Sequence, residues 1–354
     1  MITTAPIIFL ESLTNCTTYF SFEKYGKIFI LVDENTKEHC WPLLLSNNSA
    51  FKNAILIEIQ SGEQHKNLST CEKIWQLLFW HKADRNSLFI NLGGGVIGDM
   101  GGFIASLYKR GIDFINFPTT LLAMVDATVG GKTGIDFLNF KNGIGLFQQP
   151  AHIFIHTGFL KTLSEIEILS GFAEIIKHAL ISPMPENWQT IKSINEINKI
   201  SAAELQKIIE QSIKIKSNIV KNDYKETGER KVLNFGHTIG HAIESYALQL
   251  NKTIPHGYAI AWGIIAELQL AQQYCNMPNI EINQIEKYIH TNYKNVFNFK
   301  FSSEELNIYL ENDKKNIDNQ ISFSLLEKIG KPTYNIYCNE QDVKKAINYL
   351  EEIL

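Results

Sequence analysis

An alternation of apolar runs with helix-like segments, ahead of residue 160, constrains the fold of this chain more than any other feature. The runs that read as strands are residues 27–32, 54–59, 87–92, 113–117 and 152–156. Residues 68–80 place Cys71, Ile74 and Leu78 at helical spacing between two of these runs. Strands that are apolar on both faces need helices on both faces, which is the arrangement of a parallel sheet. The sequence therefore predicts an α/β N-terminal domain.

After residue 160 the predicted secondary structure changes from alternating strands and helices to mainly helices. The segments that read as helices are residues 164–180, 202–220, 233–250, 257–273 and an amphipathic 341–354. A pair of strand-like segments, 321–326 and 333–338, interrupts them. We predict two domains, an α/β nucleotide-binding domain over residues 1–160 and a mainly α-helical domain over residues 161–354.

Composition and charge exclude several classes of protein. Hydrophobic residues make up 45% and charged residues 20% of the 354 residues, which is typical of a soluble globular protein. A net charge of −4 gives no basic field for nucleic acid or anionic lipid. The apolar stretch 258–270 contains Glu267 and is too short to span a bilayer. We therefore expect neither nucleic acid nor a membrane as a partner.

The cysteines and the N-terminus indicate the compartment. The five cysteines are odd in number and widely spaced, without a CxxC pair. This favours reduced thiols over a disulfide framework. The first residues lack a basic segment and reach Glu11 early, unlike a signal peptide. We expect a cytoplasmic protein.

A glycine-rich turn, Gly93 to Asp99, follows the third predicted strand. Glycines at such a turn let the backbone approach a pyrophosphate, and the N-terminus of the next helix favours an anion. The alternative is a tight strand–helix turn without a ligand. Because the cluster lies on the third strand, it differs from the standard GxGxxG dinucleotide motif.

A second motif runs from Pro118 to Asp126 and continues into Gly130-Gly131-Lys132-Thr133. It reads either as an apolar helix capped by threonine or as part of a substrate site. The GKT sequence does not satisfy the full GxxxxGK[ST] phosphate-loop pattern. We interpret Lys132 as a point charge for a substrate anion, and Lys141 and Asn142 as candidates for the same pocket.

In a third motif, Glu174, Lys177 and His178 share one helical face. A Glu–Lys pair at this spacing is usually a surface ion pair. Here the flanking residues are apolar, so the charges are expected to be buried and to need a role.

Three histidines near one another in the sequence favour a metal site. His237 and His241 lie four residues apart on one expected helix, and His256 follows downstream. A lone histidine is more often structural than a ligand. Three of them with an acid elsewhere fit the three ligands and open position of catalytic zinc. The segment is not HExxH, which argues against a zinc hydrolase of that type.

Arginine is rare in this chain. Of the 33 lysines and arginines, only Arg85, Arg110 and Arg230 are arginines. A chain that uses lysine for surface charge can keep arginine where a planar, bidentate fork matters, although chance is an equally good explanation for any one of them.

Together and in this order, the segments GGGVIGD, PTTLLAMVDATVGGKTGID, FAEIIKH and LNFGHTIGHA resemble the 3-dehydroquinate synthase family and its close cyclase relatives. The resemblance runs from Asp33 to the triplet Asp313-Lys314-Lys315. It implies the two-domain fold, NAD and zinc as cofactors (with cobalt able to substitute), and a homodimer. Gly134 departs from the family, which often has alanine there.

The resemblance also implies site residues. The NAD contacts would be Asp33, Asn35, Glu63, Lys66, Gly94, Gly95, Asp99, Thr119, Thr120, Lys132, Lys141 and Thr162. The zinc ligands would be Glu174, His237 and His256. The substrate groups would be Asp126, Lys132, Lys141, Asn142, Lys177, Lys216, Arg230, Asn234, His241 and Lys314, which is favoured over Lys315. Arg110 would reach the site of the neighbouring subunit.

The implied reaction converts the seven-carbon keto-sugar acid phosphate DAHP into 3-dehydroquinate and phosphate, with transient oxidation by NAD. Three alternatives stay open. A zinc-dependent polyol dehydrogenase would need fewer anion-binding residues. A sister cyclase, forming an inosose or a valiolone, would not need both Lys216 and Arg230 for a carboxylate. A catalytically inactive NAD-binding regulator would not need Glu174, His237 and His256.

Overall fold

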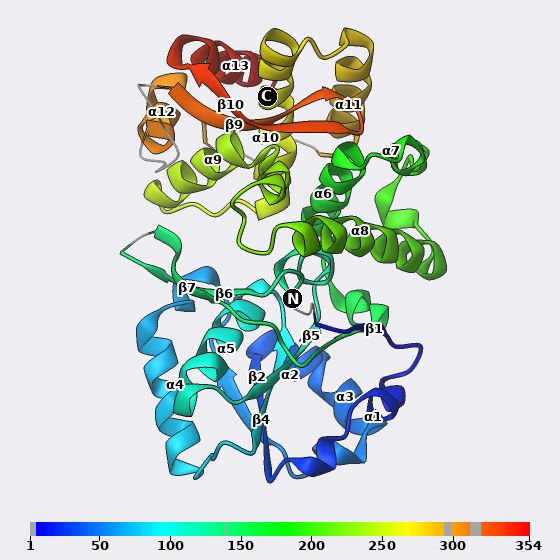
Figure 1. The fold of residues 1–354 in the computed structure, drawn as a ribbon, viewed down its shortest axis with the longest axis vertical. Helices are drawn as coiled ribbons and strands as arrows, with labels where there is room; N and C mark the ends of the chain where they lie inside the picture. The colour runs from blue at the N-terminus through cyan, green and yellow to red at the C-terminus, as the bar shows by residue number, and fades with distance from the viewer. Residues whose placement is uncertain (1–4, 139, 294–298, 312–319) are drawn as a thin grey trace. The chain divides into compact units, whose positions relative to one another are not determined.

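The computed structural model describes residues 5–138, 140–293, 299–311 and 320–354 (Figure 1). The chain forms two compact units, Met1–Ser164 and Glu165–Leu354, which we call the sheet unit and the helical unit. Within the described residues, no helix is long and apolar enough to cross a membrane. The described part of the chain excludes Lys314 and Lys315, so the predicted substrate contact at that triplet cannot be placed.

A parallel sheet of six strands, in the order β1-β8-β5-β4-β2-β3, forms the centre of the sheet unit. The strands are β1 Ile7–Phe9, β2 Lys27–Asp33, β3 Ile55–Ile59, β4 Ser87–Gly93, β5 Asp113–Pro118 and β8 His152–Ile155. The five predicted strands are confirmed. The edge strand β1 was not predicted, because three residues are too short to show a periodicity.

Helices cover both faces of this sheet (Figure 1). On one face, α4 Leu68–Trp80 and α5 Gly95–Leu107 pack Ile74 and Ile104 against Phe29 and Phe89 in the core. The shorter helices of the unit are α1 Cys16–Tyr19, α2 Glu34–His39 and α3 Trp41–Asn47. Beyond α3, Phe51 packs edge-on against Phe117 of β5. The predicted α/β class is confirmed, and α4 has the predicted bounds.

An antiparallel hairpin, β6 Lys132–Phe137 with β7 Phe140–Phe147, was not predicted. Its strands mix glycine, lysine and asparagine with apolar residues, so neither shows a clean alternation. The stretch before it is helical over residues 121–127, most of which form a π-helical turn, Ala123–Ala127. The hairpin carries three predicted site residues, Lys132, Lys141 and Asn142.

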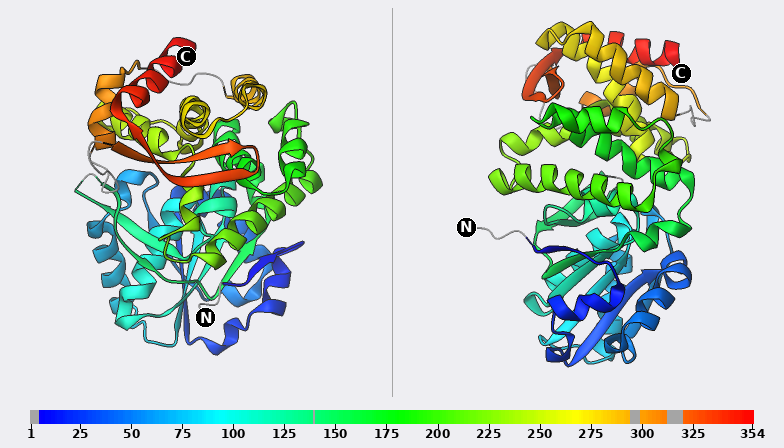
Figure 2. Two further views of the ribbon diagram at one scale, coloured as in Figure 1. Left: turned by 45° about the horizontal axis from the view of Figure 1, so that its top comes forward. Right: turned by 90° about the vertical axis from the view of Figure 1, so that its right-hand side faces the viewer.

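Eight helices and one hairpin make up the described part of the helical unit (Figure 2). The helices are α6 Glu165–Ile181, α7 Pro185–Lys192, α8 Ala202–Asn222, α9 His237–Gln249, α10 His256–Cys275, α11 Asn279–Asn292, α12 Ser303–Glu311 and α13 Glu340–Ile353. The two predicted strand-like segments lie in β9 Gln320–Lys328 and β10 Lys331–Asn339, which pair antiparallel. Helices α7, α11 and α12 were not predicted.

The predicted helix over residues 233–250 is wrong at its start. A short 3-10 helix, Glu229–Asn234, ends before Phe235, and α9 begins only at His237. Between them Gly236 has φ +80°, a left-handed conformation that L side chains rarely adopt. The glycine therefore breaks the helical path and makes His237 the first residue of α9.

Candidate active site

The carboxyl ends of neighbouring strands bring several predicted nucleotide residues to one edge of the sheet. Asp33 ends β2, Gly94 and Gly95 follow β4, and Thr119 follows β5. The peptide N–H of Thr119 donates to Gly93 O at 3.0 Å, which ties two of these strand ends together. Ligands of open parallel sheets bind at such an edge, next to a helix N-terminus. The arrangement can accept a dinucleotide.

Two residues at this edge have clear local roles as well. Asp33 accepts a hydrogen bond from Thr36 N at 2.7 Å and so caps α2. Thr120 Oγ1 accepts one from Ala123 N at 3.1 Å at the start of the next helical turn. Both contacts are local, and neither distinguishes a binding role from a structural one.

The buried Lys66 forms a cluster with other predicted residues that are partly exposed. Its ammonium donates to Asp99 Oδ2 at 2.7 Å and to Asn142 Oδ1 at 2.6 Å. Glu63 lies 3.7 Å from the same ammonium. Burial lowers the pKa of Lys66, but Asp99 and Glu63 outweigh it and raise that pKa above its ordinary value. Lys66 is therefore a fixed positive charge.

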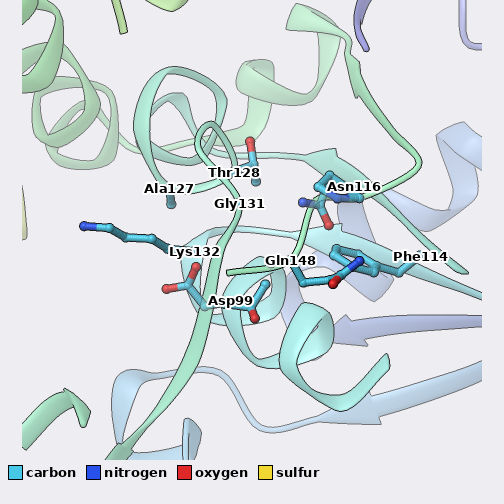
Figure 3. Close-up of a pocket in the computed structure, with 11 residues that line it drawn as sticks. Asp99, Phe114, Asn116, Ala127, Thr128, Gly131, Lys132 and Gln148 are labelled. Atoms are coloured by element: carbon cyan, nitrogen blue, oxygen red, sulfur yellow. The ribbon is translucent and has the colours of Figure 1, made fainter. Parts of the chain in front are cut away.

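Next to this cluster, a small pocket is lined by residues of α5, β5 and the start of the hairpin, including Asp99, Asn116 and Thr128 (Figure 3). Lys132 contributes to the rim, and its side chain extends away from Asn116 and Gln148 (Figure 3). Lys132 and Lys141 are exposed, whereas Asp126 is half-buried in the π-helical turn.

Three other predicted residues of the sheet unit are exposed. Asn35 lies in α2, Thr162 ends the 3-10 helix Thr157–Thr162, and Arg110 ends the turn Tyr108–Arg110 with φ +71°. Their exposure leaves them accessible to a ligand or to a second subunit.

In the helical unit, three helices bring Glu174, His237 and His256 together. Glu174 lies in α6 and is fully buried, while the two histidines are the first residues of α9 and α10. Glu174 Oε1 is 3.4 Å from His237 Nε2 and 3.5 Å from His256 Nε2. These ligand-type atoms belong to one cluster of side chains that could hold a metal ion.

The outer nitrogen of each histidine has an acceptor of its own. His237 Nδ1 is 3.2 Å from Phe235 O, and His256 Nδ1 is 3.3 Å from Glu244 Oε2. Placing the protons on Nδ1 leaves both Nε2 lone pairs aimed at Glu174. Histidines that bind metals usually donate their other N–H to a carbonyl or carboxylate in this way.

The charges of the cluster follow from its burial. Burial raises the pKa of Glu174, but Lys177 and the two histidines hold it well below its ordinary value, so the carboxylate is ionised. Burial and the Lys177 ammonium keep the pKa of His237 well below its ordinary value. Burial opposes a charge on His256, yet Glu244 and Glu174 raise its pKa to about 10. A cation that binds here must displace that proton.

The donor set fits a divalent metal. Ligands about 2.0–2.1 Å from a tetrahedral zinc lie roughly 3.3 Å apart, close to the spacing of these atoms. Within the described part of the chain, neither oxygen of Glu174 accepts a hydrogen bond of ordinary geometry, although Oε2 forms an ion pair with Lys177. Acceptor atoms that face one another repel unless a positive charge lies between them, which is the His256 proton in the metal-free protein and would be the metal ion once it binds.

A second donor set shares His256. It consists of His241, Glu244 and His256, with His241 Nε2 3.9 Å from Glu244 Oε2. The His241 side chain is 57% exposed, and Glu244 already faces His256 Nδ1. This set is therefore more open than the first, and its carboxylate is already engaged.

The helical unit also buries three cations, of which Lys177 pairs with Glu174 of the first set. Lys177, Lys216 and Arg230 are 1%, 6% and 2% exposed. Arg230 donates to Tyr224 O at 2.6 Å, and Asn234 donates to Glu226 Oε1 at 2.9 Å. The third residue of the Glu174–Lys177–His178 motif, His178, packs toward α8, with Nδ1 2.7 Å from Ser212 Oγ. The helical unit thus buries positive charge that could meet an anionic substrate.

Two contacts of the site were not anticipated from the sequence. Glu244 lies one turn beyond His241 on α9, a spacing that could have indicated a partner for a histidine. Asp136 accepts a hydrogen bond from Asn142 N at 2.7 Å and holds that residue at φ +52°. The second contact depends on the unpredicted hairpin and had no signal of its own.

Comparison with known families and proteins gives a consistent result. Family models described as the N-terminal and C-terminal parts of 3-dehydroquinate synthase match residues 56–170 and 171–316. A 3-dehydroquinate synthase of Parabacteroides distasonis is 42% identical over 334 residues, covering 94% of each chain. One from Campylobacter jejuni subsp. doylei is 40% identical and covers 90% of each chain.

Solved structures share the fold. A 2-deoxy-scyllo-inosose synthase, complexed with carbaglucose-6-phosphate, NAD+ and Co2+, aligns with a TM-score of 0.87 at 25% identity, covering 97% of this chain and 96% of that one. The 2-epi-5-epi-valiolone synthase of Streptomyces hygroscopicus aligns with a TM-score of 0.89 at 21% identity, covering 100% and 98%. With the motif order, the two units and the matched relatives in agreement, the chain belongs to the 3-dehydroquinate synthase family.

Proposed function

We propose that this chain is a 3-dehydroquinate synthase, a carbon–oxygen lyase of the shikimate pathway of aromatic amino-acid biosynthesis. It converts DAHP into 3-dehydroquinate and inorganic phosphate. The observation that carries the proposal is the crowding of Glu174, His237 and His256 beside the buried Lys177, in a chain 42% identical to a 3-dehydroquinate synthase.

The cofactors would be NAD and a divalent metal, with zinc as the metal and cobalt able to substitute. Two proteins of the same fold carry NAD+ with Co2+ or with Zn2+. Glu174, His237 and His256 would hold the metal, and the sheet edge formed by Asp33, Gly94 and Thr119 would hold the dinucleotide. When bound, NAD takes and returns a hydride, and the metal polarises the hydroxyl that is oxidised.

The other cations would bind and orient the substrate. Arg230 can donate two parallel hydrogen bonds to a carboxylate, and Lys216 adds a second positive charge. Lys177 forms an ion pair with Glu174, so its ammonium would lie near the metal and could bind a polar group of the substrate there. In the sheet unit, the predicted substrate groups are Lys132, Lys141, Asn142 and Asp126. Holding the substrate by both of its anionic groups fixes the reacting carbons in position.

His241 would serve the leaving phosphate rather than the metal. It lies one helical turn beyond His237, with ring centroids 5.1 Å apart, and its side chain is largely exposed. A histidine in that place can donate a hydrogen bond to a phosphate oxygen as the bond to carbon breaks. The alternative role is to orient the site without touching substrate.

Two rival activities share the fold. A probable glycerol dehydrogenase aligns with a TM-score of 0.63 at 12% identity, which shows a common fold alone. An uncharged polyol needs few anion-binding residues, whereas Lys177, Lys216 and Arg230 are all buried in this chain. A sister cyclase would accept a sugar phosphate without the carboxylate, for which Arg230 and Lys216 together would be superfluous.

Assembly and location follow from the family resemblance. The protein would act as a cytoplasmic homodimer in which the exposed Arg110 completes the partner's site. All five cysteines lie in the described residues and are free thiols, in keeping with a reducing compartment.

The direct test supplies purified protein with DAHP, zinc and NAD in catalytic amounts. We expect phosphate and 3-dehydroquinate in equal amounts, without net NADH at roughly 340 nm. Accumulation of NADH in step with product would indicate a plain dehydrogenase. Equal turnover of a sugar phosphate that lacks the carboxylate would favour a sister cyclase.

A further inference from the structure

Both helices that present a histidine to the metal cluster begin at that histidine. α9 starts with His237 and α10 with His256, and the preceding residues, Gly236 and Pro255, provide no side-chain cap. The first peptide N–H groups of a helix have no acceptor within the helix. In this buried place, other residues must accept their hydrogen bonds.

A carboxylate from α10 supplies that acceptor for α9. Glu267 Oε2 accepts a hydrogen bond from Gly236 N at 2.6 Å, and Oε1 accepts one from Ile239 N at 3.2 Å. The N–H of Thr238 also faces the carboxylate. Glu267 is fully buried and is the only acidic residue of α10.

The two helices approach closely where this contact forms. Gly263 lies one turn before Glu267 on α10, and a Cβ on it would lie 2.2 Å from Gly236 O. A Cβ on Gly236 would lie 2.5 Å from Ile264. The absence of side chains at both positions brings the backbones together, so the Glu267 carboxylate reaches across to the first turn of α9.

We infer that Glu267 is a positioning residue of the metal site, which clamps the first turn of α9 so that His237 faces Glu174 and His256. Its hydrogen bonds reach Gly236 and Thr238, the residues on either side of His237 in the chain. Because Glu267 and His256 belong to the same helix, the clamp sets the two ligand histidines relative to each other. The inference rests on the proposed metal site.

A negative charge at this place also matches the electrostatics of α9. The N-terminus of a helix carries a partial positive charge, so a carboxylate is stabilised there. Burial favours the neutral acid and raises the pKa of Glu267 to about 8, whereas the peptide N–H groups that donate to both of its oxygens favour the carboxylate and oppose that rise. A carboxylate in an otherwise apolar helix is costly, which argues that its hydrogen bonds have a role.

The test replaces Glu267 by glutamine, which keeps the length of the side chain. Its amide NH₂ would point at one of the peptide N–H groups, so the first turn of α9 must shift. We expect Glu267→Gln to bind zinc about 10- to 100-fold more weakly in a chelator competition assay. The visible absorption of the cobalt-loaded protein should shift as well, because the ligand geometry changes.

The control is Glu286→Gln in α11. Glu286 is also a partly buried carboxylate of the helical unit, and it accepts hydrogen bonds from Gln269 and Tyr349. Glu286 caps neither ligand helix. We therefore expect the zinc affinity and the cobalt spectrum of Glu286→Gln to match those of the parent. Equal zinc affinity and an unchanged spectrum in Glu267→Gln would overturn the inference. A parent protein that binds no divalent metal would instead overturn the proposed function.

Hydrogen exchange of the parent protein gives a second test that needs no variant. The N–H groups of Gly236, Thr238 and Ile239 should exchange slowly even without metal, because Glu267 accepts their hydrogen bonds. Rapid exchange over residues 236–239 would show that the clamp does not hold and would contradict the inference, whether or not Glu267→Gln folds.

Discussion

The sheet unit and the helical unit each contain an ion pair between a buried lysine and a carboxylate, but the surroundings of the two pairs differ. Lys66 meets Asp99 at 2.7 Å and the amide oxygen of Asn142 at 2.6 Å, so donors face acceptors. Lys177 meets Glu174 in the same way, yet the other oxygen of Glu174 faces the Nε2 atoms of His237 and His256.

This difference separates a structural ion pair from a metal site. In the sheet unit, complementary hydrogen-bonding groups neutralise the buried charge. In the helical unit, three acceptor atoms converge once the Nδ1 protons are assigned to Phe235 O and Glu244. In the metal-free protein the His256 proton lies among these acceptors, and a divalent metal can take its place, so we expect the helical unit rather than the sheet unit to respond to a divalent metal.

The largest expected effect is stabilisation by that metal. A free zinc concentration about 1,000 times Kd should raise the free energy of unfolding by about 4 kcal/mol, since the metal binds only the folded state. Hydrogen-exchange mass spectrometry should show the gain in protection in α6, α9 and the start of α10. Protection that appears in the sheet unit instead would contradict the assignment of the metal site to the helical unit.

Replacing Lys66 by methionine should destabilise the protein by about 3 kcal/mol, because it leaves Asp99 buried without its cation. Urea unfolding measures the loss, and zinc affinity should stay unchanged. The control is Lys331→Met, which breaks the exposed pair Lys331–Glu327 and should cost less than about 1 kcal/mol. If both variants lose the same stability, Lys66 is not the buried charge described above.

The smallest effect concerns Asp342, a carboxylate of the helical unit that is surrounded by donors. Lys345, Tyr274 and Asn339 donate to it and lower its pKa to about 2. Because this pKa lies below the unfolded value of about 3.9, the stability it adds is present above pH 4 and lost as the pH falls toward 2. Urea titrations of Asp342→Asn should show a smaller loss of unfolding free energy between pH 4 and pH 2 than those of the parent protein.

The matched control for this prediction is Glu352→Gln, an exposed acid on the same helix. It should leave the dependence of stability on pH between 2 and 4 as in the parent. If the free energy of unfolding falls equally steeply below pH 4 in Asp342→Asn and in the parent, other carboxylates dominate the loss.

Much of the fold could be predicted because strong patterns were present. The buried strands β2 and β4 are continuous apolar runs, and α4 shows a clear helical period. The edge strand β1 and the hairpin β6–β7 lack such patterns, so tertiary pairing decides them. The start of α9 was misplaced because the period continues through Leu233, whereas the left-handed Gly236 interrupts the helix.

The candidate site was less accessible from the sequence than the fold. The histidine spacing alone pointed to His237 and His241 equally, whereas the family resemblance named Glu174, His237 and His256. The structure adds that Glu174 faces these two histidines. Glu267 was visible as a lone acid in an apolar stretch, a pattern that marks a buried charge with a role. Its partner could not be read from the sequence, because the contact depends on how closely α9 and α10 pack.

The central claim is that Glu174, His237 and His256 hold the metal while His241 does not. The most direct measurement is the metal content of His256→Ala and His241→Ala, purified in parallel with the parent after zinc loading. We expect His256→Ala to lose its zinc, and His241→Ala to keep nearly the zinc content of the parent while its turnover falls. A His241→Ala protein without zinc, together with a His256→Ala protein that still carries it, would contradict the account.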